Sequence, residues 1–256
     1  MTFKQKFRLV IPIIACDKIE KYSNEIRRVN QTWGAKALEY PEIKLIFFLG
    51  QEKTTEFIGD LYVNLPNVND DYTSATDKQY LGIKYMYDNF DFDFLYICAA
   101  DAYVNIPKLL LYLNNFNPND NLYIGNDGNK ITIFNKDYWY SYGGAGIILT
   151  IECIKKLYPI LTINLKNDWF DICKQNNIYD KYKDACDVAL GYYLQQSDIN
   201  SKIIKNTDLF IAYLNYKWPY RYKYPNFNDI IAFHDVRDDQ FNILDTLYKA
   251  DNYFIY

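Results

Sequence analysis

The stretch FDFLYICAA (residues 92–100) decides the fold of this chain. It is strongly apolar, which is typical of a buried strand, and it runs straight into Asp101. Two more apolar runs of this kind precede it, FRLVIPIIAC (7–16) and IKLIFFL (43–49). Between the runs, apolar residues at helical spacing predict helices over 20–33 and 76–90. This alternation is typical of an α/β fold, with a mostly parallel central sheet flanked by helices.

Ligand sites in such sheets lie at the carboxyl ends of the strands, so the segment just after Cys98 is where we expect chemistry. Beyond it, Asn105 can cap a helix that carries Pro107 in its first turn and continues to about residue 114. Near the N-terminus, Gly34 is expected to stop the first helix.

The second half of the chain is less regular, but it shows no linker, repeat or low-complexity tract. We expect short strands at 61–63, 122–125 and 130–134, a glycine turn entering a strand over 140–150, and a strand over 228–236. Helices are expected at 150–158, 187–196 and 238–249. Residues 1–256 are therefore predicted to form a single domain.

The composition excludes several functional classes. A formal net charge of −4 argues against a chain-wide attraction to nucleic acid. The only histidine, His234, excludes a multi-histidine zinc site, and a Ser/Cys–His hydrolase would have to use it. The five cysteines are odd in number and form no CxxC pair, which indicates free thiols in a reducing compartment. The apolar run at the N-terminus is too short to cross a bilayer, so we expect a cytoplasmic protein without a membrane span.

Several short blocks, in a fixed order, resemble the inverting β-1,3-glycosyltransferases that include Fringe and the core 1 galactosyltransferases. The blocks are EIRRVNQTWG (25–34), DDYTSATDKQ (70–79), DFDFLYICAADAYVNIPKLL (91–110), YGGAGIILT (142–150), CDVALGYYL (186–194) and IAFHDV (231–236). The resemblance implies a GT-A fold, with a nucleotide-sugar-binding half over about 7–125 and an acceptor-binding half over about 126–256. It also implies a UDP-sugar donor, Mn²⁺ or Mg²⁺ as cofactor, and β-1,3 transfer of galactose or N-acetylglucosamine to a glycan or glycoprotein hydroxyl.

The resemblance assigns Asp101 and His234 to the metal and the donor diphosphate, and Asp187 to the general base. A hard cation neutralises a leaving diphosphate, and a carboxylate must take the proton of the attacking hydroxyl. The alternatives are a solvated loop acid for Asp101, a core histidine for His234 and a helix cap for Asp187. The family usually has an acidic triplet where this chain has Ala99, Ala100 and Asp101. A glycosyltransferase-like protein that binds nucleotide sugar or glycan without turnover is therefore the alternative function.

Other matched positions carry weaker assignments. Gly143, Gly144 and Gly146 would let the backbone approach the donor sugar, or would simply form a turn. Lys78 would face phosphate, or would be a solvated surface lysine. Asn30 stands where the family often has Arg or Lys, which removes a nucleotide contact. Alternate aromatic residues in YLNYKWPYRYKY (213–224) suit a core strand, a sugar platform or a single-stranded nucleic-acid surface.

Overall fold

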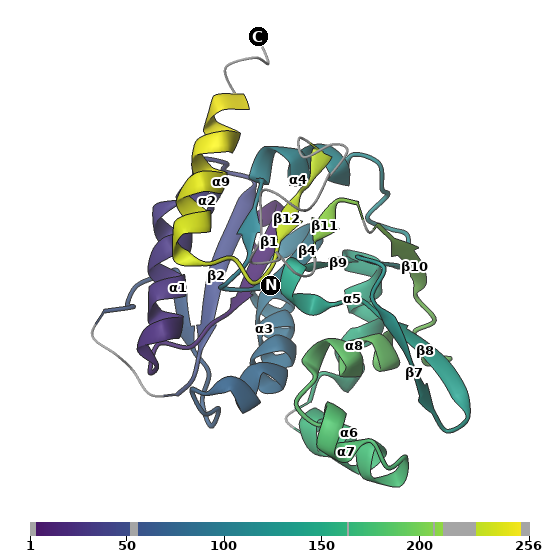
Figure 1. Ribbon diagram of the computed structural model, residues 1–256. Coiled ribbons are helices and arrows are strands. Elements are labelled where there is room, and N and C mark those ends of the chain that lie inside the picture. The colour runs from purple at the N-terminus through teal and green to yellow at the C-terminus, as the bar shows by residue number, and fades with distance from the viewer. Residues whose placement is uncertain (1–3, 52–55, 163, 207, 212–228, 252–256) are drawn as a thin grey trace.

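A seven-stranded sheet forms the centre of the computed structural model, which describes residues 4–51, 56–162, 164–206, 208–211 and 229–251 (Figure 1). Its strands, in spatial order, are β10 (Lys202–Lys205), β6 (Leu122–Gly125), β9 (Ile147–Thr150), β4 (Asp91–Ala99), β1 (Lys6–Ile14), β2 (Ile43–Leu49) and β3 (Tyr62–Asn64). β9 runs antiparallel to both of its neighbours, whereas the other pairings in this sheet are parallel. The predicted mostly parallel α/β sheet is confirmed.

Helices cover both faces of this sheet. They are α1 (Glu20–Gln31), α2 (Trp33–Ala37), α3 (Ala75–Asn89), α4 (Ile106–Leu113), α5 (Ile151–Leu157), α6 (Leu165–Gln175), α7 (Tyr179–Tyr182), α8 (Cys186–Leu194) and α9 (Asp238–Asp251). Buried residues of α1, α2, α4 and α9 pack with one face of the sheet, and those of α3, α5, α6 and α8 pack with the other. Successive strand residues therefore enter opposite cores, which is why β1 and β4 read as unbroken apolar runs.

Two small sheets complete the fold. β5 (Tyr103–Val104) pairs with β12 (Ala232–Phe233), which also pairs with β11 (Phe210–Ile211). β7 (Asn129–Ile133) and β8 (Lys136–Tyr140) form a hairpin. No helix among the described residues is both long and apolar enough to cross a bilayer.

Some local predictions are wrong. Gly34 does not stop the first helix; it lies within α2, where an added Cβ would sit 2.6 Å from the carbonyl oxygen of Val29. Glycine is thus needed for the close approach of α2 to the end of α1. The strand expected over 228–236 comprises only the two residues of β12. The turn of the β7–β8 hairpin was missed because Phe134 and Asn135, both at positive φ, form no glycine turn signal. Residues 213–224 lie outside the described part of the chain.

A buried ion pair ties the carboxyl ends of β1 and β2 to α3. Lys78 of α3 lies 2.6 Å from the carboxylate of Asp70, and the two side chains are 1% and 0% exposed. The same carboxylate accepts hydrogen bonds from the backbone N–H groups of Asp17, Lys18 and Gly50. Burial alone would raise the pKa of Asp70, but the bonds from Asp17 and Lys78 and the lysine charge outweigh it and hold that pKa well below its usual range.

Removing one partner would leave a buried charge without compensation. Lys78→Met should therefore lower the free energy of unfolding by about 3 kcal/mol in urea denaturation at pH 7. Lys84→Met is the matched control, because Lys84 lies on the same helix and pairs with Asp88 at the surface. That change should cost less than about 1 kcal/mol. Equal losses for the two variants would show that the buried pair does not brace the fold.

Candidate active site

A cavity of about 310 Å³ opens at the carboxyl ends of β1 and β4. This volume is within the range of small-molecule sites. The predicted site residues that line it are Lys78, Asp101, Gly143, Gly144, Asp187 and His234, together with Ala99 and Ala100. Gly146 is not among the lining residues. The structure therefore brings together in one cavity residues that are up to 156 positions apart in the sequence.

Asp101 and His234 meet because the backbone on both sides of each is fixed. Asp101 follows β4, and its carbonyl oxygen accepts a hydrogen bond from the N–H of Val236 at 3.0 Å. The antiparallel register of β5 and β12 places Phe233 opposite Tyr103. As a result, Nε2 of His234 lies 3.3 Å from Oδ2 of Asp101.

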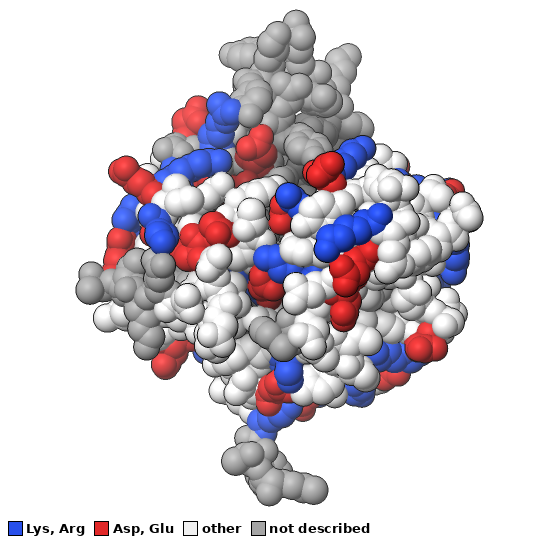
Figure 2. Space-filling model, turned by 90° about the horizontal axis from the view of Figure 1, so that it is seen from below, with Lys and Arg blue, Asp and Glu red and all other residues white. Residues whose placement is uncertain are grey.

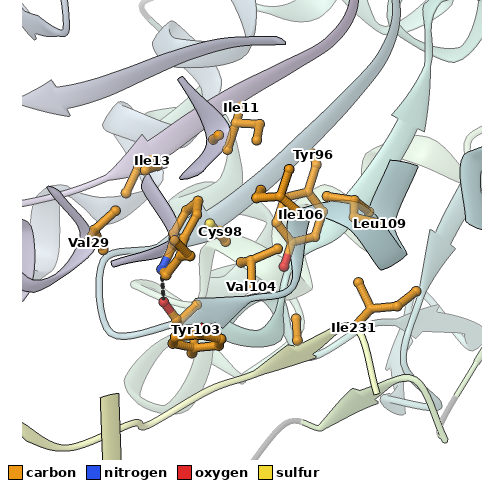
Figure 3. Close-up of a cluster of buried hydrophobic side chains, with 14 of the residues drawn as sticks. Ile11, Ile13, Val29, Tyr96, Cys98, Tyr103, Val104, Ile106, Leu109 and Ile231 are labelled. Carbon is orange, nitrogen blue, oxygen red and sulfur yellow. Dashed lines mark hydrogen bonds between the residues drawn. The ribbon is translucent and has the colours of Figure 1, made fainter. Parts of the chain in front are cut away.

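The TWG block (32–34) has a role in this arrangement. The indole N–H of Trp33 donates a hydrogen bond of 2.8 Å to the carbonyl oxygen of Ala102, directly after Asp101. Trp33 is fully buried with Cys98, Tyr103 and Val104 in the apolar cluster shown in Figure 3. The cluster holds α2 against the turn that carries Asp101, so the TWG block helps to fix the position of Asp101 from the core side.

The pair formed by Asp101 and His234 is suited to a divalent cation. Oδ1 of Asp101 is buried and has no hydrogen-bond partner among the described residues, which leaves an oxygen ready for a ligand. Carboxylate oxygen and imidazole nitrogen are ligands that Mn²⁺ accepts. The described residues contain no cluster of three or more His, Cys, Asp or Glu side chains arranged to hold a metal. A cation held here would need further oxygen ligands from the donor diphosphate or water.

Asp187 lies in the first turn of α8 and faces the glycine turn. Its carboxylate accepts hydrogen bonds from the N–H groups of Gly143, at 3.1 Å, and Val188, at 2.8 Å. The N-cap residue of α8 is Ala185, so Asp187 does not occupy that position. Burial raises the pKa of Asp187, although these hydrogen bonds oppose the shift. Burial also raises the pKa of the neighbouring Cys186 thiol, which stays protonated at neutral pH and does not replace a carboxylate.

The three glycines have different surroundings. A Cβ at Gly144 would sit 2.2 Å from the His234 ring, and one at Gly143 would sit 3.0 Å from Cβ of Asp187. Gly146 has a φ of 96°, and a Cβ there would meet the Tyr96 ring at 2.1 Å. Gly143 and Gly144 thus let the side chains of Asp187 and His234 approach the backbone, whereas Gly146 packs on the core strand β4.

Lys78 and Asn30 are both held by contacts within the protein. Lys78 is not a solvated surface lysine, because its ammonium group binds Asp70 and the carbonyl oxygen of Ala15 at 2.8 Å. Lys78 is nevertheless among the residues that line the cavity. Asn30 donates a hydrogen bond to the hydroxyl of Tyr62 and does not line the cavity.

Glu25 of α1 lines the same cavity and was not predicted as a site residue. It is only 7% exposed. Burial, followed by the charge of Asp101, raises its pKa to about 7. The sequence held a signal for this position, because Glu25 lies three positions after Tyr22 and four before Val29, on the apolar stripe of the helix.

Tyr72 is a second lining residue that was not predicted, and it is 70% exposed.

The cavity lining is acidic. Its carboxylates come from Glu25, Asp71, Asp101, Asp184 and Asp187. The only lysine or arginine among the described lining residues is Lys78, whose charge Asp70 already balances. By contrast, the outer face in Figure 2 shows Lys and Arg interspersed with Asp and Glu, without an extended basic surface among the residues described there.

The fold matches that of known sugar-transferring enzymes. The chain is similar to apo GlyE, a glycosyltransferase of Streptococcus pneumoniae TIGR4, with a TM-score of 0.51 and 12% identity, over 92% of this chain and 56% of that one. It thus spans little more than half the length of GlyE. A glycosyltransferase involved in glycosylation of the major capsid of PBCV-1 is also similar (TM-score 0.49, 11% identity, 94% and 99% coverage). So is the galactosyltransferase LgtC in complex with donor and acceptor sugar analogs (TM-score 0.45, 12% identity, 95% and 96% coverage). The fold is that of a GT-A glycosyltransferase.

The family can be stated more closely. A sequence model described as Fringe-like matches residues 13–223, and the chain belongs to this Fringe-like family of glycosyltransferases. No curated protein sequence matches the chain well enough to add to this.

The raised pKa of Glu25 has a consequence for stability. Between its ordinary pKa of 4.5 and about 7, the unfolded chain loses the Glu25 proton before the folded chain does, so the free energy of unfolding falls as pH rises. Glu25→Gln removes this term. Relative to wild type, the variant should gain on the order of 2 kcal/mol between pH 5 and pH 8 in urea denaturation without metal. Glu20→Gln, an exposed change on the same helix, should show no such gain. If the free energies of unfolding of wild type and Glu25→Gln differ by the same amount at every pH, the pKa of Glu25 is not raised in the folded protein.

Proposed function

We propose that the protein is a metal-dependent, inverting glycosyltransferase that uses a UDP-sugar. The observation that supports this most directly is the acidic lining of a cavity in a Fringe-like GT-A fold. A sugar diphosphate carries negative charge, and five carboxylates would repel it. A cation between the carboxylates and the phosphates would remove this repulsion and strengthen binding of such a donor, which is the reason for the proposed metal dependence.

Asp101 and His234 are the residues that would hold the cation. Mn²⁺ or Mg²⁺ bound there neutralises charge on the leaving diphosphate. The protein's own contribution is to keep the two side chains in contact, through the β5–β12 pairing and the bond between Trp33 and Ala102. Gly144 allows the imidazole to lie against the backbone.

Asp187 is proposed as the general base. Its carboxylate accepts hydrogen bonds from the backbone N–H groups of Gly143 and Val188. The residue after Gly143, Gly144, lies against the ring of His234. It would accept the proton of the acceptor hydroxyl while that hydroxyl attacks the anomeric carbon. A raised pKa brings the base closer to neutral pH, where proton uptake is better matched. One such displacement inverts the anomeric centre.

The proposed donor, linkage and acceptor are those that the family resemblance implies. We propose UDP-galactose or UDP-N-acetylglucosamine as donor, a β-1,3 linkage as product, and a glycan or glycoprotein hydroxyl as acceptor. Gly143 and Gly144 are proposed to let the backbone approach the donor sugar, and Lys78 to support the phosphate side of the cavity from its buried position. For Gly146, the packing on Tyr96 favours a structural role.

The second candidate function rests on Ala99 and Ala100. Both residues line the cavity and neither supplies an acid. A chain with this change can bind nucleotide sugar without transferring it.

Release of UDP distinguishes the two functions. With UDP-galactose or UDP-N-acetylglucosamine and Mn²⁺, we expect UDP to be released, and we expect EDTA to stop the release because the acidic cavity binds the diphosphate much more weakly without a cation. Release that is unaffected by EDTA would contradict metal dependence. Binding of UDP with Mn²⁺, without turnover of any donor, would favour the second function.

Asp187→Asn tests the base. Transfer should fall by about 10²-fold or more, because the amide cannot accept the proton, while UDP binding measured by calorimetry should stay unchanged. Asp180→Asn, at an exposed position of α7, is the control and should keep wild-type transfer. Wild-type transfer by Asp187→Asn would mean that another group is the base.

A further inference from the structure

We propose that Glu25 is an additional acidic group of the cation site, and that it replaces by position the acids that β4 lacks at Ala99 and Ala100. Its role is to accept hydrogen bonds from water bound to the cation that Asp101 and His234 hold. This inference rests on the proposed function. Glu25 comes from α1, far in the sequence from the end of β4, so the carboxylate reaches the cavity from a different element.

The burial of Glu25 is the first observation. Its side chain is more than nine-tenths buried and lines the cavity. Among the described residues, no hydrogen bond or ion pair holds its carboxylate. An isolated buried carboxylate costs free energy, so this group does not stabilise the apo protein. A buried polar group without a partner, facing a cavity, points to a ligand.

The other residues of the cavity indicate the kind of ligand. Glu25 lines it together with Asp101 and His234, and Oδ1 of Asp101 is buried without a hydrogen-bond partner among the described residues. Two carboxylates that line one cavity suit a positive ion. An anionic donor alone would add a third negative group, so the occupant that suits both carboxylates is a divalent cation.

The other acids of the cavity do not share this property. Asp71 is engaged in a capping box, in which its carboxylate accepts hydrogen bonds from Thr73 and Ser74. The carboxylate of Asp187 is bound by backbone N–H groups. Asp184 is half-exposed and is solvated. Apart from Asp101, whose Oδ1 also has no hydrogen-bond partner among the described residues, Glu25 is the buried acid of the described lining whose carboxylate is not already bound within the protein.

Contact through water, rather than direct ligation, fits the geometry. The described side chains include no three-residue cluster that could bind a metal directly, so Glu25 does not complete one with Asp101 and His234. Groups that orient the ligands and waters of a metal contribute 10–100-fold to its affinity.

Binding of Mn²⁺ in the presence of UDP tests the proposal. Free Mn²⁺ is measured by electron paramagnetic resonance for wild type, Glu25→Gln, Glu25→Ala and the exposed control Glu20→Gln. Both changes at Glu25 should weaken Mn²⁺ binding about tenfold or more, and the control should stay within about twofold of wild type. Thermal unfolding of each variant confirms that it is folded.

Binding of UDP in EDTA distinguishes the loss of the Glu25 charge from structural damage to the cavity. Without metal, Glu25→Gln should bind UDP at least as tightly as wild type, because a repelling charge has gone, whereas a damaged cavity would bind UDP less tightly. Wild-type Mn²⁺ affinity in both Glu25 variants overturns this inference and leaves the proposed function standing. Failure of wild type to bind Mn²⁺ with UDP overturns both.

Discussion

The buried pair of Asp70 and Lys78 is the interaction on which the rest of the structure depends. A single carboxylate binds the chain just after β1 and at the end of β2, and the lysine joins both to α3. Of these segments, the end of β1 and the first turn of α3 line the cavity, so the pair holds part of its wall together. The pair stabilises the fold only because the hydrogen bonds to the Asp70 carboxylate are all made. Each backbone N–H that binds it replaces part of the hydration that burial removed. The contacts of Lys78, which the family resemblance placed near phosphate, are thus structural ones.

The functional side chains lie on elements that differ in how firmly they are held. Asp101 follows the central strand β4, which lies between β1 and β9, and the Asp101 carbonyl oxygen accepts a hydrogen bond from the N–H of Val236. His234 follows a strand of two residues, and Asp187 is held through the glycine turn. The acidic character of the cavity is shared among all three regions and α1, so no one segment contains the site.

The sequence was sufficient for the central sheet and much less so for its surroundings. The runs 7–16, 43–49 and 92–100 are long, apolar and buried on both faces, which leaves little choice but a strand. The proximity of Asp101 and His234 could be inferred only from the family resemblance, because periodicity does not say which loops meet. Glu25 was missed because a single acid at an apolar position of a helix does not by itself indicate a functional site. The structure shows what the pattern could not, that this position faces a cavity. The length of β12 depended on its partner β5, which has no signal of its own in the sequence.

The small sheet of β11, β12 and β5 has a further consequence. Its strands are two residues long, and it adjoins a seven-stranded sheet with an extensive core. Segments with few backbone hydrogen bonds open locally at a lower free energy than the whole domain. Opening of β12 would separate the imidazole from the carboxylate while the central sheet stays folded. The contact between Asp101 and His234 would then open and close without unfolding of the whole domain, and a ligand that bridges the two residues would stabilise the small sheet.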